Sequence, residues 1–167
     1  KSHLLFDKDF FPLFSSGGSG QFIKDLDNNK YLDLISSLGA VSLGYGMKSL
    51  NKKLINVIKL GNTFSLSHKK ELELAKILTK LIPSAEMVRF GKNGTDVNSA
   101  AIRLARHITK RNHIAVCGYH GWQDWYIAST TMSTGVPNLT KKYTNTFEFN
   151  NIDSLKKIFS EKSLAAV

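Results

Sequence analysis

Residues 93–95, Asn-Gly-Thr, stand at a junction whose chemistry suits an anion. The apolar residues 87–90 are typical of a strand, and residues 95–109 have the apolar spacing of a helix that begins at Thr95. The start of such a helix offers unpaired N–H groups at its positive end, while Gly94 allows close approach and Thr95 adds a hydroxyl. The junction is either a phosphate-binding turn or only a well-capped helix start, and its local sequence leaves both open.

Residues 117–138 form a second region of interest, because they show no clear helix or strand periodicity. Long loops in compact domains are usually functional or disordered, and the aromatic residues Tyr119, Trp122, Trp125 and Tyr126 argue against disorder. The loop follows the strand of residues 113–117, and ligands of parallel sheets bind at the carboxyl ends of the strands. We therefore expect phosphate donors and a stackable aromatic ring at one edge, which favours a flat, phosphorylated aromatic cofactor.

Other readings of this region are weaker. Cys117 and His120 could form a nucleophilic pair, but no third group orients them, and a buried strand cysteine is the simpler interpretation. The same residues with His113 are too sparse for zinc, so we expect no metal. Trp122 and Trp125 are interpreted as core or dimer-contact residues.

The elements that must position these residues indicate an α/β fold. Residues 1–62 read as an N-terminal segment with a hairpin (22–26 and 31–35) and a helix within 47–61, and Gly17, Gly18 and Gly20 as a plain loop. Residues 63–167 read as the first part of a large domain. Its first helix is capped by Ser67 and ended by Pro83.

From residue 86 onward, strands alternate with helices, which predicts a mainly parallel sheet covered by helices on both faces. The expected strands are 87–90, 113–117, 144–149 and 164–167, and the expected helices are 95–109 and 152–161. In the helix 95–109, one apolar face should pack on the sheet; it consists of Val97, Ala101, Leu104, Ala105 and Ile108. Because the chain stops inside an apparent strand, we expect it to be a fragment.

Composition narrows the class of protein. The 167 residues are 42% hydrophobic and 22% charged, with a formal net charge of +10. The basic residues are scattered, so we predict a lysine-rich surface and no nucleic-acid partner. A single cysteine, no long apolar run and no secretory signal predict a cytoplasmic protein without membrane association.

The chain as a whole resembles the first part of a class III aminotransferase, a fold type I enzyme that depends on pyridoxal 5'-phosphate, and within that family the glutamate-1-semialdehyde aminomutase branch. GSGQFIKDLDNNKYLDLISSLGAVSLGY resembles the lead hairpin of the family, with its D-x-D-G-x-x-Y-x-D pattern and later L-G-H. KNGTDVNSAAIRLAR is similar to N-S-G-T-E-A-x-x-x-A-I-R-L-A-R, and GYHGWQDWY to the Y-H-G loop. IDSLKKIFSEKSLAAV resembles the segment that leads into A-A-V-I-x-E-P.

The resemblance implies roles for matched positions. Asn93, Gly94 and Thr95 would bind the cofactor phosphate, Tyr119 would stack on the pyridine ring and His120 would lie beside it. Ser37 would lie on the substrate side. The resemblance also implies a small-molecule amino donor, a carbonyl acceptor and a homodimer.

Departures from the family pattern accompany the match. Asn93 replaces a serine, Asp96 a glutamate and Tyr45 a histidine. The Schiff-base lysine and the acidic partner of the pyridine nitrogen would lie beyond residue 167, so the resemblance implies no catalytic residue in this fragment and no transamination by the fragment alone. The function predicted for the full-length protein is a pyridoxal-phosphate-dependent aminotransferase, with an aminomutase as the alternative. A non-catalytic binding or assembly module that keeps the fold is the alternative of another class.

Overall fold

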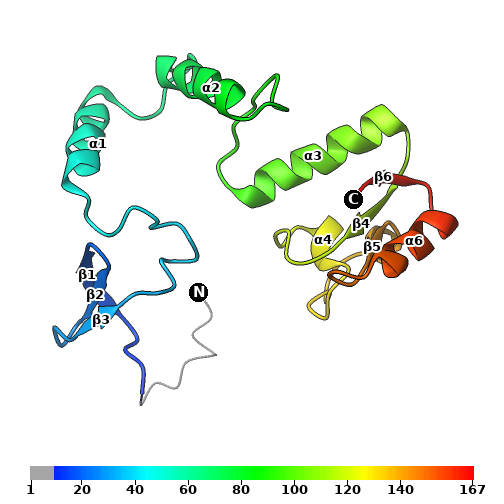
Figure 1. The fold of residues 1–167 in the computed structure, drawn as a ribbon, viewed down its shortest axis with the longest axis horizontal. Coiled ribbons are helices and arrows are strands. Elements are labelled where there is room, and N and C mark those ends of the chain that lie inside the picture. The colour runs from blue at the N-terminus through cyan, green and yellow to red at the C-terminus, as the bar shows by residue number, and fades with distance from the viewer. Residues whose placement is uncertain (1–9) are drawn as a thin grey trace. The chain divides into compact units, whose positions relative to one another are not determined.

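The computed structural model describes residues 10–167, which form two compact units that divide between Glu71 and Leu72 (Figure 1). Residues 1–9 of the predicted N-terminal segment lie outside the described residues. The predicted domain boundary between residues 62 and 63 stays a prediction. Within the described range, no helix has the length and apolar character that crossing a bilayer requires.

The first unit contains a three-stranded antiparallel sheet in the order β1-β2-β3. Its strands are β1 (Ser15–Ser19), β2 (Phe22–Asp25) and β3 (Lys30–Leu32). The predicted hairpin is confirmed with shorter strands, but the interpretation of the glycine-rich lead-in as a plain loop is wrong. Residues of β1 pair with β2 through their backbones, which needs no apolar side chain, and Gly18 lies against the ring of Tyr45. Such a strand carries no periodic apolar signal.

Asp25 organises the turn between β2 and β3. Its buried carboxylate accepts hydrogen bonds from the N–H groups of Asp27 and Asn29, each at 2.9 Å, from Asn29 Nδ2 at 3.0 Å and from the hydroxyl of Tyr31 at 2.8 Å. The bond from the Asn29 side chain is the largest influence on the pKa of Asp25, and together with the bonds from Tyr31 and the backbone it outweighs burial and lowers that pKa. The hairpin turn is therefore built around an ionised carboxylate.

The helices α1 (Lys48–Leu60) and α2 (Lys69–Leu81) confirm the two helices expected before residue 83. Gly61 ends α1 with a positive φ of 99°, as predicted. At the start of α2, His68 takes the position predicted for Ser67, and its Nδ1 accepts a hydrogen bond of 3.1 Å from the N–H of Lys70. No residue of either helix is buried within the described part of the chain.

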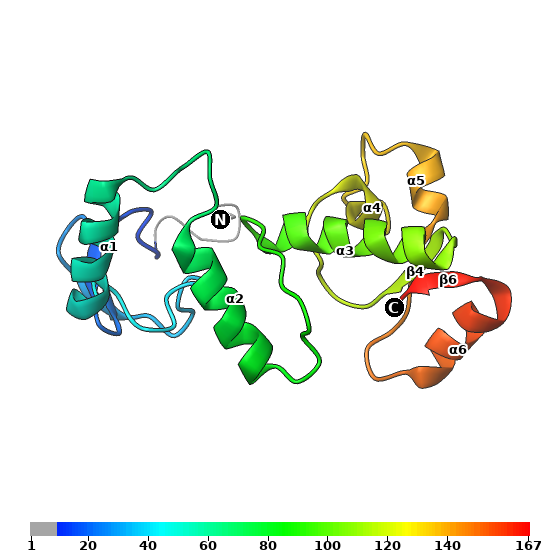
Figure 2. The same ribbon diagram turned by 90° about the horizontal axis from the view of Figure 1, so that it is seen from above.

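The second unit is an α/β arrangement, which confirms the predicted fold class. Its three strands form a parallel sheet in the order β5-β4-β6, and α3 lies along one face (Figures 1 and 2). The bounds are α3 (Gly94–Thr109), β4 (His113–Val116), α4 (Asp124–Ile127), α5 (Asn138–Lys142), β5 (Thr144–Thr146), α6 (Ile152–Glu161) and β6 (Leu164–Ala166). The short α4 lies in the segment where no periodicity was recognised, and α5 begins at the last residue of that segment.

The core of this unit is centred on β4. Ile114 is fully buried, and Val116 and Tyr126 form a cluster with it. Ile102 of α3 and Trp125 of α4 pack against this cluster. The core thus joins the central strand to the helix before it and to the loop after it.

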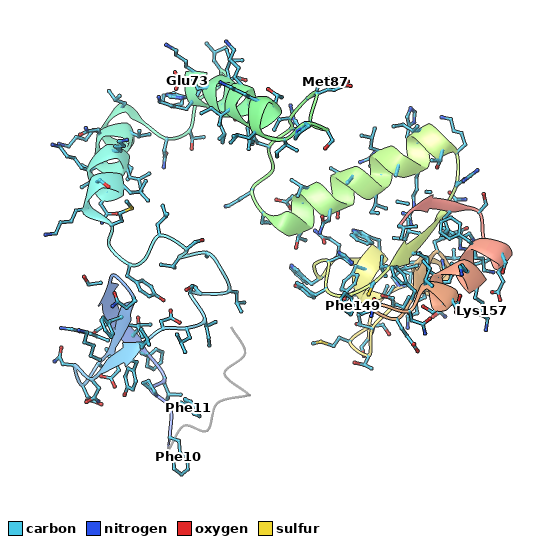
Figure 3. The ribbon with its side chains drawn as sticks, viewed as in Figure 1. Phe10, Phe11, Glu73, Met87, Phe149 and Lys157 are labelled. Atoms are coloured by element: carbon cyan, nitrogen blue, oxygen red, sulfur yellow. The ribbon has the colours of Figure 1, made fainter. Side chains whose placement is uncertain are left out.

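The strand predicted at residues 87–90 is wrong, because this segment pairs with no strand in the described part of the chain. Both edges of β4 are occupied, by β5 and by β6. Met87 is accordingly 89% exposed (Figure 3). The predicted strand 144–149 is also shorter than expected, since β5 ends at Thr146 and the side chain of Phe149 is exposed (Figure 3).

The prediction of which face of α3 packs on the sheet is also wrong in part. Val97, Leu104 and Ile108 are exposed, whereas Ile102 contacts the core. The rotation of the helix is set by polar contacts: Asn98 Nδ2 donates to the carbonyl of His120, and Trp125 Nε1 donates to Ser99 Oγ. Because of these bonds, the side of α3 that carries Asn98 and Ser99 faces the loop that follows β4.

The lowered pKa of Asp25 gives a testable pH dependence. The turn is stabilised while Asp25 is ionised, so this contribution is present above the ordinary pKa of 3.8 and is lost as the pH falls through the lower folded value. We expect the amide chemical shifts of Asp27 and Asn29 to titrate with a midpoint below 3.8. Asp25→Asn should abolish this titration and weaken the turn at neutral pH, because an amide offers one acceptor oxygen instead of two.

The matched control is Asp27→Asn, which removes the same charge from an exposed position and should preserve the titration. A midpoint at or above the ordinary value would contradict the assignment of Asp25 as the organising carboxylate.

Candidate functional site

The start of α3 presents backbone N–H donors of the kind that bind anions. Asn93 is the N-cap, with extended φ and ψ of −147° and 170°, and its Oδ1 accepts a hydrogen bond of 2.9 Å from the N–H of Asp96. The helix therefore begins at Gly94, one residue earlier than predicted, and Thr95 is its second residue. The N–H groups of Gly94 and Thr95 bond to no partner among residues 10–167. Two donors thus remain at the positive end of the helix.

The loop after β4 brings Tyr119 and His120 to the same end of the unit. Tyr119 is 75% exposed, so one side of its ring is accessible. His120 Nε2 lies 2.8 Å from the carbonyl oxygen of Cys117. Since a carbonyl only accepts, Nε2 carries the proton of this hydrogen bond. Cys117 itself lies just after β4 and is half-buried, so it is not the buried strand residue expected.

Gly121 is the point where the loop meets the start of α3. A Cβ at this position would lie 2.7 Å from Thr95 Oγ1 and 2.9 Å from Gln123 Oε1. Its φ of +112° is also one that side-chain-bearing residues rarely adopt. Only glycine fits here, and its absence of a side chain lets the Tyr119-His120 segment approach the helix N-terminus.

A cleft of about 630 Å³ opens beside this contact. Its floor includes Trp125, which is held by its bond of 2.8 Å to Ser99 and packs against the core as predicted, while Trp122 remains 74% exposed. Gln123 contributes a buried Oε1 that has no hydrogen-bond partner among the described residues. The lining residues are Asn93, Thr95, Asp96, Ser99, Trp122, Gln123, Asp124 and Trp125.

The electrostatics of this cleft are mixed, because the carboxylates of Asp96 and Asp124 line it together with the helix N-terminus. An anion that binds there must therefore contact the N–H groups of Gly94 and Thr95 directly, since the general field of the cleft does not attract it. Within residues 10–167, no cluster of histidine, cysteine or carboxylate side chains is arranged to hold a metal ion.

Ser37 belongs to the first unit, whereas the other predicted site residues belong to the second: Asn93, Gly94, Thr95, Tyr119 and His120. It lies in a turn where Ser36, Ser37 and Leu38 have left-handed φ values of 49°, 53° and 60°. Asp33 holds the start of this turn by accepting the N–H groups of Ile35 and Ser36. The hydroxyl of Tyr45 donates to Asp33 at 2.5 Å, and this bond raises the pKa of Tyr45. Tyr45, the departure from the family histidine, thus has a defined structural partner.

Sequence reasoning missed the residues that hold the site together. No distinctive local pattern marks Asn98 and Ser99, because each bonds to a partner more than twenty residues away. Gly121 has no such pattern either, because it acts through the absence of a side chain. The one usable signal was Gly121, which directly follows the Tyr119-His120 pair and could have been interpreted as a close approach of two backbones.

Comparisons with known proteins agree with this geometry. A family model described as Aminotransferase class-III matches residues 6–166. The chain is 37% identical over 160 residues to a glutamate-1-semialdehyde 2,1-aminomutase of Methanosphaera stadtmanae, covering 90% of this chain and 38% of that protein. It is 38% identical over 151 residues to a 3-aminobutyryl-CoA aminotransferase of Cloacimonas acidaminovorans, covering 89% of this chain and 35% of that protein.

Among solved structures, an omega-transaminase from Sphaerobacter thermophilus superposes with a TM-score of 0.89 at 27% identity. The match covers all of this chain and 42% of the other. The chain thus spans well under half the length of the proteins it matches.

The close contact at Gly121 predicts a specific effect of adding one methyl group. Gly121→Ala should destabilise the second unit by about 1–2 kcal/mol for the positive φ and by about 1–3 kcal/mol more for the contact with Thr95. Gly135→Ala is the matched control, since Gly135 has a φ of +85° but no atom within 4 Å of its Cβ position. Thermal or denaturant unfolding of the natural-length protein measures both variants, and equal losses at the two positions would show that the loop and helix are not in contact.

Proposed function

Because the chain belongs to the class III aminotransferase family, we propose that the protein at its natural length transfers an amino group between a small-molecule donor and a carbonyl acceptor. The family match confirms the predicted fold type I architecture and pyridoxal 5'-phosphate as the cofactor. The observation that carries the proposal is that the N–H groups of Gly94 and Thr95 have no partner among the described residues. The exposed ring of Tyr119 belongs to the same unit.

The residues present fit this cofactor. Its phosphate needs donors that approach closely, and at Gly94 no more distant part of the described chain lies within 4 Å of the position a Cβ would take. Thr95 adds a hydroxyl to the two backbone donors, and Gly121 keeps the neighbouring loop backbone close to this hydroxyl. The aromatic ring of the cofactor needs a flat apolar surface, which Tyr119 supplies.

The proposed roles follow from these positions. Gly94 and Thr95 bind the phosphate through their N–H groups and the threonine hydroxyl. Asn93 uses Oδ1 for its cap and keeps Nδ2 as a donor toward the phosphate, in place of the family serine. Tyr119 stacks on the pyridine ring, and His120 lies beside it with its Nε2 proton committed to Cys117. Ser37 is proposed to face the substrate.

When bound, pyridoxal phosphate supplies the electron sink that lets a bond at the amino-bearing carbon break. The residues of this chain contribute binding and orientation: the helix start fixes the phosphate, and the tyrosine fixes the ring plane. Proton transfer needs a lysine, and the ring nitrogen needs an acid. We propose that a segment following residue 167 provides both, which is supported by the greater length of the matched proteins.

Two related activities compete for the detailed reaction. The relatives include both a glutamate-1-semialdehyde 2,1-aminomutase and a 3-aminobutyryl-CoA aminotransferase at nearly equal identity. An aminomutase would move the amino group within one five-carbon skeleton, whereas an aminotransferase would need a separate acceptor. We propose the aminotransferase, as a cytoplasmic homodimer. Product analysis with and without an added keto acid distinguishes the two.

The decisive experiment is the intact mass of the protein from its natural source. A mass well over twice 18.6 kDa would support the enzyme, which should then carry a visible cofactor chromophore that borohydride bleaches. A mass near 18.6 kDa with no chromophore would overturn the enzymatic proposal and favour the non-catalytic module.

The role of the Thr95 hydroxyl is tested by a near-isosteric change. Thr95→Val should weaken pyridoxal phosphate binding about tenfold to hundredfold, because a hydrogen bond to a charged group contributes about 1.5–3 kcal/mol. Thr109→Val makes the same change at the other end of α3, where the hydroxyl donates to the carbonyl of Ala105 and accepts from the N–H of Arg111, and it should leave the affinity unchanged. Fluorescence titration with the cofactor measures both, and equal affinities for Thr95→Val and the unmodified protein would exclude this contact.

A further inference from the structure

Tyr126 is buried and hydrogen-bonded although it lies in a short helix of four residues. It lies in α4 yet is only 7% exposed, packed with Ile114 and Val116 of the central strand. Its hydroxyl donates a hydrogen bond of 2.7 Å to the carbonyl of Gly118, the second residue after β4. A tyrosine buried in this way has both its apolar ring and its polar end engaged.

The ring of Tyr126 also supports both residues proposed to contact the cofactor. Its centroid lies 5.7 Å from that of Tyr119 and 5.5 Å from that of His120, with interplanar angles of 86° in each pair. These are edge-to-face arrangements, which favour one relative orientation of two rings over others. One buried ring therefore contacts two adjacent rings of the loop.

Tyr126 and its neighbour Trp125 are held in place by hydrogen bonds to several elements. The hydroxyl of Thr144 in β5 donates to the carbonyl of Trp125, and the indole of Trp125 donates to Ser99 of α3. The N–H of Tyr126 bonds to the carbonyl of Gln123 at 2.9 Å. Tyr126 is thus tied to the sheet and to α3, whereas Tyr119 is largely exposed and has no side-chain hydrogen bond among the described residues.

From this arrangement we infer that Tyr126 is a positioning residue, which sets the ring plane of Tyr119, and through it that of the cofactor, by bonding Gly118 and packing against Tyr119 and His120. The inference rests on the proposed function, since it gives Tyr119 the stacking role. Tyr126 itself lies behind the loop and need not touch the cofactor. Gly118, with a φ of +83°, is the hinge that this hydroxyl holds in place.

The test is Tyr126→Phe, which removes the hydroxyl and keeps the ring. Loss of one neutral hydrogen bond should lower the affinity for pyridoxal phosphate about fivefold, and it should change the circular dichroism of the bound cofactor. The affinity for inorganic phosphate, measured by competition, should stay unchanged, because phosphate uses only the start of α3. Tyr143→Phe is the matched control: Tyr143 is half-buried in the same unit and its ring contacts His113.

The outcomes are distinguishable in the natural-length protein. A selective loss for pyridoxal phosphate in Tyr126→Phe, absent from Tyr143→Phe, supports the inference. Unchanged pyridoxal phosphate affinity and dichroism overturn it. An equal loss for pyridoxal phosphate and inorganic phosphate also overturns it, because that pattern indicates general loosening of the unit. If the unmodified protein binds inorganic phosphate but no pyridoxal phosphate, the proposed function fails, and the positioning role fails with it.

Discussion

The contact between Gly121 and Thr95 is the constraint on which the rest of the site depends. A Cβ at Gly121 would lie 2.7 Å from Thr95 Oγ1, so the loop after β4 lies too close to the Thr95 side chain for a residue that carries a Cβ. This closeness places the donors of one segment beside the aromatic residues of the other. It requires a buried glycine with positive φ in the loop, and it requires that the helix begin before Thr95, which Asn93 achieves by capping.

The same contact explains why α3 is rotated away from its most apolar face. Asn98 and Ser99 lie one turn along from Thr95 and bond to His120 and Trp125 of the loop. The helix is therefore oriented by polar bonds near its N-terminus, and Ile102 is the apolar residue that this rotation brings to the core. Leu104 and Ile108 remain exposed within the described residues.

The sequence allowed prediction of features that depend on local pattern. The parallel arrangement of β4, β5 and β6, the extent of α3 and the two earlier helices follow from periodicity and end signals. Features that depend on a distant partner were not predictable. The strand β1 is defined by its pairing with β2, and the segment at Met87 has no strand to pair with among residues 10–167. The orientation of α3 is set by side chains across the sheet edge. The donors at Gly94 and Thr95 were predictable because a helix start creates them wherever it occurs.

Asn93, which replaces the family serine, can cap the helix and donate toward a phosphate with two different atoms. A serine at the helix start can accept from the helix backbone and donate toward a phosphate at once, but both hydrogen bonds then use the same oxygen. The carboxamide of Asn93 separates these tasks. Its Oδ1 accepts from Asp96 at 2.9 Å, and its Nδ2 remains a donor on the same planar group. Because the cap fixes the carboxamide plane, the direction of the remaining donor is fixed as well, and the departure from the family serine is compatible with an intact phosphate site.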